Sequence, residues 1–111
     1  MALTLHLHYL CPYARRTLYC MSYCGLNATI VEQDISNKSE QLLKLNPMGK
    51  VPIIEVEDKV IFESYGTMQY LVDITKRHEI LPADPAERAV VFSYQDIVGQ
   101  LPMNMLRFVR D

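Results

Sequence analysis

A cysteine lies between an apolar strand and an amphipathic helix in the segment Cys11–Arg16, whose sequence is CPYARR. The free amide N–H groups and the positive end of a helix dipole favour the thiolate over the thiol, so sulfur at this position is nucleophilic. Pro12 suits the first helical turn, where no N–H donor is needed. A dithiol motif would have a second cysteine at position 14, where this chain has Ala14. Redox chemistry at Cys11 therefore has to be completed by a thiol from another molecule.

A second segment that could meet Cys11 in space is Asn46–Pro52, whose sequence is NPMGKVP. This loop enters an apolar strand through the Val51–Pro52 bond. A cis bond at this point would turn the backbone N–H and C=O of Val51 outward, where an extended peptide could pair with them. A simple turn at the start of a strand is the alternative, because proline is commonly tolerated there.

A third segment, Phe62–Ser64, lies where a strand gives way to a helix. We expect Ser64 to be the N-cap of that helix, so that the free N–H groups of the next turn can hold a carboxylate. Glu63 beside it can hold an ammonium group. Together the two residues would bind the two charges of a free amino-acid end. The alternative is an ordinary serine cap beside an exposed acid.

Four residues near the cysteine are candidates for an auxiliary role. Tyr9 could activate a bound thiol through its hydroxyl group, or could simply be an aromatic residue at the end of a strand. Arg15 and Arg16 follow the cysteine and could attract an anion, although solvated helix charges are the common case. Tyr13 lies on the helix face that also carries the two further cysteines, and it is the remaining auxiliary candidate.

The remaining cysteines and histidines give little support to a metal site. Cys20 and Cys24 lie one helical turn apart, and two such thiols are more often small core residues than a metal pair. His6 and His8 share one face of a strand, but no matching second pair of ligands accompanies them. We therefore expect no bound metal.

The hydrophobic periodicity predicts the strands and helices that position these segments. A helix between the first two strands makes them parallel, which is a βαβ unit. Glu57 and Asp58 form a tight turn between the last two strands, which predicts an antiparallel hairpin. The predicted elements are a strand over Leu3–His8, a helix over Pro12–Cys24, a strand over Asn27–Gln33, a short helix over Ser39–Leu45, strands over Val51–Val56 and Lys59–Phe62, and a helix from Ser64 to near His78. This order, βαβ-α-ββα, is that of an α/β thioredoxin-like fold over residues 1–80.

Residues 81–111 are predicted to be a linker and one amphipathic helix. Asp84 is the expected N-cap, because Pro85 and Glu87 follow it at the first and third helical positions. Pro102 is expected to kink or interrupt the helix. Its apolar stripe consists of Val90, Tyr94, Ile97 and Leu101, broadened by Val91, Val98 and Met105. No later element covers this stripe, so we expect either a partner surface or a chain that is a piece of something larger.

Composition bounds the classes of function. The chain has 111 residues, of which 50% are hydrophobic, and its net charge is −2. Its 11 basic and 13 acidic residues leave no basic block, so we expect no nucleic-acid partner. Neither a long apolar run nor a charged-then-apolar leader is present, and we expect no membrane span or secretory signal. Three cysteines do not suit a disulfide framework, so we expect a cytoplasmic location.

Three motifs in this order carry a resemblance to a known family. CPYARR, NPMGKVPIIE and FESYGTMQYL resemble the N-terminal glutathione-binding domain of the glutathione transferase superfamily. The cysteine-containing, omega-like branch, which is related to the glutaredoxins, is the most similar. The resemblance covers residues 3–80, and the helix start at Asp84 resembles the first helix of the family's all-helical second domain. Only that opening helix is present here, whereas the second domain supplies most of the pocket for an electrophile.

The resemblance implies a role for each matched residue. Cys11 would attack a glutathionylated substrate or be capped by glutathione. Val51 would pair its backbone with the cysteinyl part of the tripeptide, with Pro52 in cis. Glu63 and Ser64 would hold the γ-glutamyl ammonium and carboxylate groups. Lys38 matches the omega-like lysine that reaches the glycyl carboxylate.

The sequence therefore predicts a glutathione-dependent thiol transferase with a monothiol mechanism at Cys11. Glutathione would be its co-substrate, an electrophilic or disulfide small molecule its second substrate, and a homodimer its expected assembly. The alternative is a non-catalytic glutathione-binding, dimerisation or adaptor module of the same fold, which the uncovered apolar stripe favours.

Overall fold

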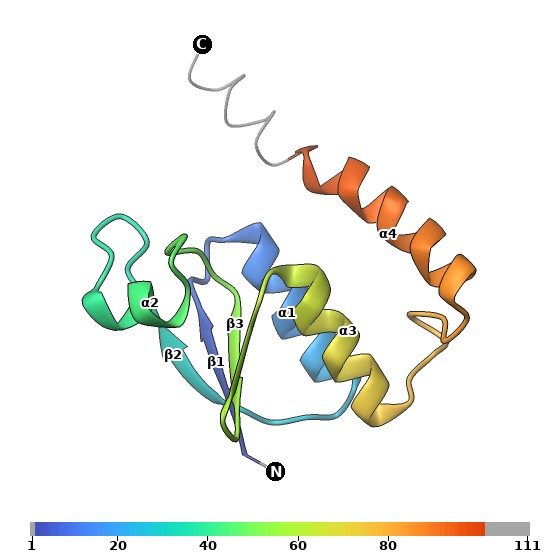
Figure 1. Ribbon diagram of the computed structural model, residues 1–111, viewed down its shortest axis with the longest axis horizontal. Helices are drawn as coiled ribbons and strands as arrows, with labels where there is room; N and C mark the ends of the chain where they lie inside the picture. The colour runs from blue at the N-terminus through green and yellow to red at the C-terminus, as the bar shows by residue number, and fades with distance from the viewer. Residues whose placement is uncertain (1, 102–111) are drawn as a thin grey trace.

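A four-stranded mixed sheet with helices on both sides forms the fold in the computed structural model, which describes residues 2–101 (Figure 1). Its elements are β1 (Leu3–Leu7), α1 (Pro12–Tyr23), β2 (Thr29–Glu32), α2 (Glu40–Leu45), β3 (Ile53–Val56), β4 (Lys59–Phe62), α3 (Ser64–Thr75) and α4 (Pro85–Gly99). The predicted order βαβ-α-ββα, followed by one helix, is confirmed. The third helix ends at Thr75 rather than near His78, because Lys76 adopts a left-handed backbone conformation with φ of 58°.

The sheet has the strand order β2-β1-β3-β4. The helix α1 crosses between β1 and β2, and these strands are parallel as predicted. The strand β3 runs antiparallel to β1 and forms the predicted hairpin with β4 through Glu57 and Asp58. Along one row of the sheet His6 pairs with Ile53, and Ile53 pairs with Phe62.

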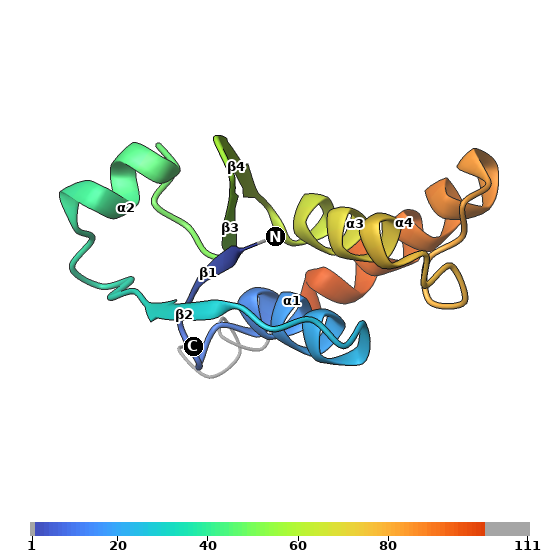
Figure 2. The ribbon, with the colours of Figure 1, turned by 90° about the horizontal axis from the view of Figure 1, so that it is seen from below.

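The helices α1 and α3 lie side by side on one side of the sheet, whereas α2 lies on the other side (Figure 2). Alternate apolar residues of β1 face the core that these helices cover, and Leu5 is fully buried. Between the helices, the hydroxyl groups of Thr17 and Thr67 form a buried hydrogen bond of 2.7 Å. The buried apolar residues of the core are Leu3, Leu5, Leu7, Ala14, Cys20, Met21, Cys24, Leu42, Val51, Ile53, Ile54, Val56, Leu71, Val72 and Leu81.

A polar network around the buried ring of His6 joins β1, β3 and the residue that follows β2, and no pattern in the sequence predicts it. His6 is buried, and its Nε2 lies 2.6 Å from Glu55 Oε2. Gln33 Nε2 lies 2.8 Å from His6 Nδ1. The Glu55 carboxylate can only accept, so this pattern assigns the ring proton to Nε2, which donates a hydrogen bond to Glu55. The Gln33 amide N–H then donates a hydrogen bond to Nδ1. Both ring nitrogens of His6 are therefore used within the sheet.

The last described helix begins where the sequence predicts. Asp84 is the N-cap of α4, and its side chain accepts a hydrogen bond of 3.0 Å from the Glu87 amide. The predicted apolar stripe faces outward, since Val90, Tyr94 and Ile97 are each more than half exposed. Pro102 and Met105 lie outside the described residues. Across residues 2–101, no helix combines the length and apolar character needed to cross a membrane.

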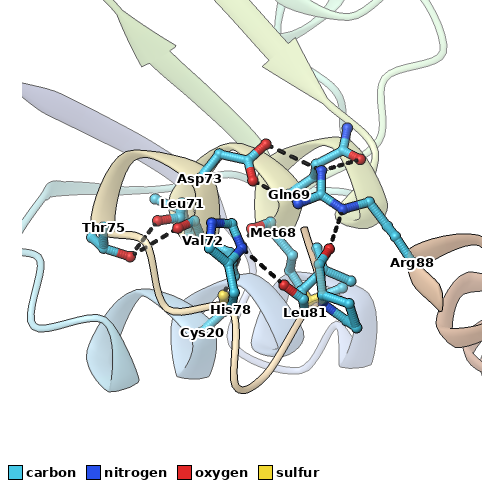
Figure 3. Close-up of polar contacts among 11 residues, drawn as sticks. Cys20, Met68, Gln69, Leu71, Val72, Asp73, Thr75, His78, Leu81 and Arg88 are labelled. Atoms are coloured by element: carbon cyan, nitrogen blue, oxygen red, sulfur yellow. Dashed lines mark hydrogen bonds and ion pairs between the residues drawn. The ribbon is translucent and has the colours of Figure 1, made fainter. Parts of the chain in front are cut away.

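Arg88 fastens the beginning of α4 to α3 (Figure 3). Its guanidinium donates two hydrogen bonds to the Asp73 carboxylate, at 2.7 and 3.2 Å, and one of 3.1 Å to Gln69 Oε1. Its Nε donates to the Pro82 carbonyl at 2.7 Å. A planar guanidinium suits this two-pronged contact because its donors form a rigid fork. The hydrogen bonds from Arg88 hold the pKa of Asp73 below its ordinary value of 3.8.

We predict that Asp73→Asn lowers the urea midpoint of unfolding at pH 7, modestly because the carboxylate is half exposed. A lowered folded-state pKa means that the ionised carboxylate stabilises the fold above pH 3.8 and that this contribution fades as the pH falls below it. The difference between parent and variant should therefore shrink in acid. An equal difference at pH 7 and in acid would show that packing, rather than charge, fastens α4.

Candidate functional site

A cavity of about 460 Å³ opens beside Cys11. Its volume lies in the range of small-molecule sites. Four segments that are distant in the sequence form its walls, and they include all six residues predicted to catalyse or to bind. The lining residues are Cys11, Tyr13, Ile35, Lys38, Asn46, Gly49, Lys50, Val51, Pro52, Glu63 and Ser64.

Cys11 lies at the position that the sequence predicts for a reactive thiol. It is the N-cap residue of α1, with an extended backbone, and it is half-buried at the cavity wall. Its side chain makes no capping hydrogen bond to the helix, and its Sγ lies 3.9 Å from the Val51 carbonyl oxygen. The thiol therefore faces the loop that precedes β3. A sulfur in this place can meet a disulfide or thiol that enters the cavity.

The loop before β3 contains the predicted cis bond between Val51 and Pro52. Asn46, which the sequence analysis did not single out, holds this loop in shape from a fully buried position. Its Nδ2 donates to the Lys50 carbonyl at 3.0 Å, and its Oδ1 accepts from the Met48 amide at 3.0 Å. An asparagine before a proline is a known turn signal, and this signal could have identified the residue.

The start of α3 differs from the prediction in one respect. Ser64 is the first residue of the helix, and Glu63 is the N-cap, so the expectation that Ser64 caps α3 is wrong. The reason is the backbone of Glu63, whose φ of 74° places the turn one residue earlier. A non-glycine residue in this region costs on the order of 1–3 kcal/mol, and such residues cluster at functional sites. Both side chains still line the cavity.

Two lysines line the cavity, and only one of them was predicted. Lys38 Nζ donates a hydrogen bond to the Met48 carbonyl at 3.3 Å, and the aliphatic part of the Lys38 side chain passes close to Gly49. A Cβ atom at Gly49 would lie 2.6 Å from Lys38 Cδ, and the φ of 63° at this glycine disfavours any other residue. Lys50 is the second cavity lysine. Its position within the predicted loop Asn46–Pro52 could have identified it as a residue of the site.

The auxiliary candidates divide into two groups. Tyr13 lines the cavity, and its hydroxyl donates a hydrogen bond to the Gly99 carbonyl in α4. Tyr9 and Arg15 are not among the lining residues. Arg15 instead donates to the Tyr9 carbonyl and, at 2.7 Å, to the hydroxyl of Tyr19 on the exposed surface of α1.

The two further cysteines are small core residues, which confirms the interpretation favoured from the sequence. Cys20 and Cys24 are both buried. Burial, followed by the neighbouring Cys24 thiol, raises the pKa of Cys20 to about 12. Within residues 2–101, no group of three or more His, Cys, Asp and Glu side chains is arranged to hold a metal ion.

Comparison with known proteins shows the family to which this fold belongs. The family profile "Glutathione S-transferase, N-terminal domain" matches residues 10–74. Glutathione S-transferase omega-1 of Sus scrofa is 32% identical over 101 residues, which cover 90% of this chain and 42% of that protein. Glutathione S-transferase U4 of Arabidopsis thaliana is 36% identical over 90 residues, which cover 80% of this chain and 40% of that protein. The chain thus spans less than half the length of these relatives.

A solved structure has the same fold. The theta class glutathione S-transferase from Xanthomonas axonopodis pv. citri, determined with glutathione bound, matches with a TM-score of 0.75 and 28% sequence identity. The match covers 86% of this chain and 47% of the solved chain. The thioredoxin-like fold predicted from the element order is therefore the fold of this family's N-terminal domain.

We predict that iodoacetamide alkylates the folded chain once, at Cys11. Burial raises the pKa of Cys20 to about 12, so this thiol stays protonated at pH 8, and both core thiols are buried. Intact mass should show one adduct on the parent chain and none on Cys11→Ser over the same period. In urea all three cysteines should react. Two adducts on the folded parent would contradict this assignment.

Proposed function

This chain belongs to the glutathione S-transferase family through its N-terminal domain, and on this basis we propose that it binds glutathione beside Cys11 and transfers glutathionyl groups through that thiol. The observation that carries the proposal is the position of Cys11 at the N-cap of α1, within a cavity whose walls carry charges of both signs. A helix N-terminus supports the thiolate, which is the attacking form of cysteine.

The charges around the cavity suit the charges of glutathione, which at neutral pH has one ammonium group and two carboxylates. In our proposal Glu63 holds the ammonium group, and Ser64 with the free N–H groups of the first α3 turn holds the adjacent carboxylate. The backbone of Val51 pairs with the central cysteinyl unit. Lys38 holds the glycyl carboxylate, with Lys50 as a second cation on the same wall.

The proposed reaction proceeds by two thiol exchanges. The Cys11 thiolate attacks the glutathionyl sulfur of a mixed disulfide, forms a disulfide with that glutathionyl group, and releases the other half of the substrate as a thiolate. A second glutathione thiolate then attacks the same glutathionyl sulfur, regenerates the Cys11 thiolate and leaves as glutathione disulfide. Over the whole cycle one mixed disulfide and one glutathione thiol enter, and the substrate thiol and glutathione disulfide leave. Because position 14 is Ala14, the second thiol comes from solution.

A second candidate function is a non-catalytic module that binds glutathione and associates through α4. The exposed apolar residues of this helix favour it, among them Val90, Tyr94 and Ile97. In either case we propose a homodimer in the cytoplasm, where a thiol stays reduced. Sedimentation velocity at micromolar concentration tests the assembly, and a monomer that binds no hydrophobic dye would contradict the module.

We predict that oxidised glutathione forms one mixed disulfide with the parent chain and none with Cys11→Ser. Intact mass measures the adduct, and reduced glutathione should remove it. Cys11→Ser should still bind reduced glutathione in calorimetry, because the binding groups remain. An adduct that persists in the variant would contradict a role for Cys11, and a chain that binds glutathione without forming an adduct would favour the non-catalytic module.

We predict opposite effects of Glu63→Gly on stability and on binding. Glycine relieves the positive φ of this residue, so the unfolding free energy should rise by about 1 kcal/mol. Loss of the carboxylate should weaken glutathione binding by roughly 10-fold, because a charge-assisted hydrogen bond is lost. The matched variant Glu63→Gln keeps the strain and should weaken binding without the gain in stability. Unchanged affinity in both variants would remove Glu63 from the site.

A further inference from the structure

The end of α4 is connected to two residues of the cavity wall, directly to Tyr13 and through Arg16 to Ser64, although α4 contributes no lining residue itself. The hydroxyl of Tyr13 donates to the carbonyl of Gly99, the last residue of α4. Arg16 makes the second connection from the adjacent turn of α1. Its Nη1 donates to Ser64 Oγ at 3.4 Å, and its Nη2 donates to the Gln95 carbonyl at 3.4 Å.

Arg16 is held in place on several sides. Its guanidinium carbon lies 5.3 Å from the ring centre of Tyr13 and 5.8 Å from that of Tyr65. Contacts of this kind between a guanidinium and an aromatic ring are attractive. A planar group with five N–H donors can bond to Ser64 and to the α4 backbone at the same time, which a single ammonium group cannot do with equal geometry.

Because Gly99 has no side chain, the guanidinium of Arg16 can lie close to the α4 backbone. Gly99 is buried, whereas its neighbour Val98 is more than half exposed. A Cβ atom at Gly99 would lie 2.9 Å from Arg16 Nη2. Glycine lowers helix propensity by about 1 kcal/mol relative to alanine, so local helix stability does not account for it at this position. Any side chain at position 99 would displace the tip of the Arg16 side chain from its present place.

We propose that Arg16 is a positioning residue that couples the docking of α4 to glutathione binding. This inference rests on the proposed function and concerns the regulation of the same site. When α4 is docked, Arg16 is held between the Gln95 carbonyl and Ser64, and Tyr13 is held by Gly99. When the end of α4 moves away, Tyr13 and Arg16 each lose a hydrogen-bond partner. Because coupling between two sites is reciprocal, glutathione in the cavity also holds α4 in place.

The test compares Arg16→Met, Gly99→Val and the double variant by calorimetry with reduced glutathione. Each single variant should raise the dissociation constant about 5-fold, the lower end of typical coupling between sites. The double variant should be no worse than Arg16→Met alone, because both changes break the same connection. Arg16→Lys should recover part of the affinity. Arg15→Met is the matched control and should leave the affinity unchanged, since Arg15 donates hydrogen bonds to Tyr9 and Tyr19 and does not line the cavity.

Hydrogen exchange without ligand separates this inference from the proposed function. Gly99→Val should speed amide exchange in the first turn of α3, including Thr67, as well as at the end of α4. A chain that binds no glutathione would overturn the proposed function, and the coupling would then be judged by this exchange alone. Unchanged exchange at the start of α3, or losses of affinity that add in the double variant, would overturn the coupling.

Discussion

The register of the central strands is the constraint on which the site depends. His6 of β1 pairs with Ile53 of β3, which pairs with Phe62 of β4. This row lies near the strand ends that lead into three of the four cavity segments, since Cys11 follows β1, Pro52 precedes β3 and Glu63 follows β4. A one-residue shift in the pairing of any two of these strands would point the side chains of one strand to the opposite face of the sheet. The segments that follow or precede the strands would then no longer meet.

Buried hydrogen bonds support this register. His6 on β1 joins Gln33 just after β2 to Glu55 on β3, so one imidazole ring spans three neighbouring chain segments. Each partner satisfies a ring nitrogen that would otherwise be buried without a hydrogen bond, which is costly. A one-residue slip between β1 and β3 would turn the side chains of Glu55 and His6 to opposite faces of the sheet. Apolar residues supply the bulk of the core, and this polar network selects one alignment of it.

The helix α4 is fastened to the domain at both ends by arginines with different surroundings. Near its start, Arg88 binds the Asp73 carboxylate on α3 (Figure 3), and neither residue lines the cavity. Near its end, Arg16 lies between the α4 backbone and the cavity residue Ser64. The first contact holds the helix against the domain, and the second links the end of the helix to a residue of the cavity wall. The outer face of α4 remains apolar and exposed between them.

Local signals in the sequence were sufficient to predict the elements and much of the site. Periodicity, the proline after Cys11 and the acidic cap at Asp84 act over a few residues, so the strands, the helices and the position of the thiol follow from the sequence alone. The cap of α3 was misplaced by one residue, because serine is the commoner cap and the positive φ of Glu63 has no local signature. Only the tertiary structure placed Arg16 against Ser64 and His6 against Glu55, which lie 48 and 49 residues apart in the chain. The physical reason is that such partners are chosen by strand register and helix packing, which no short stretch of sequence specifies.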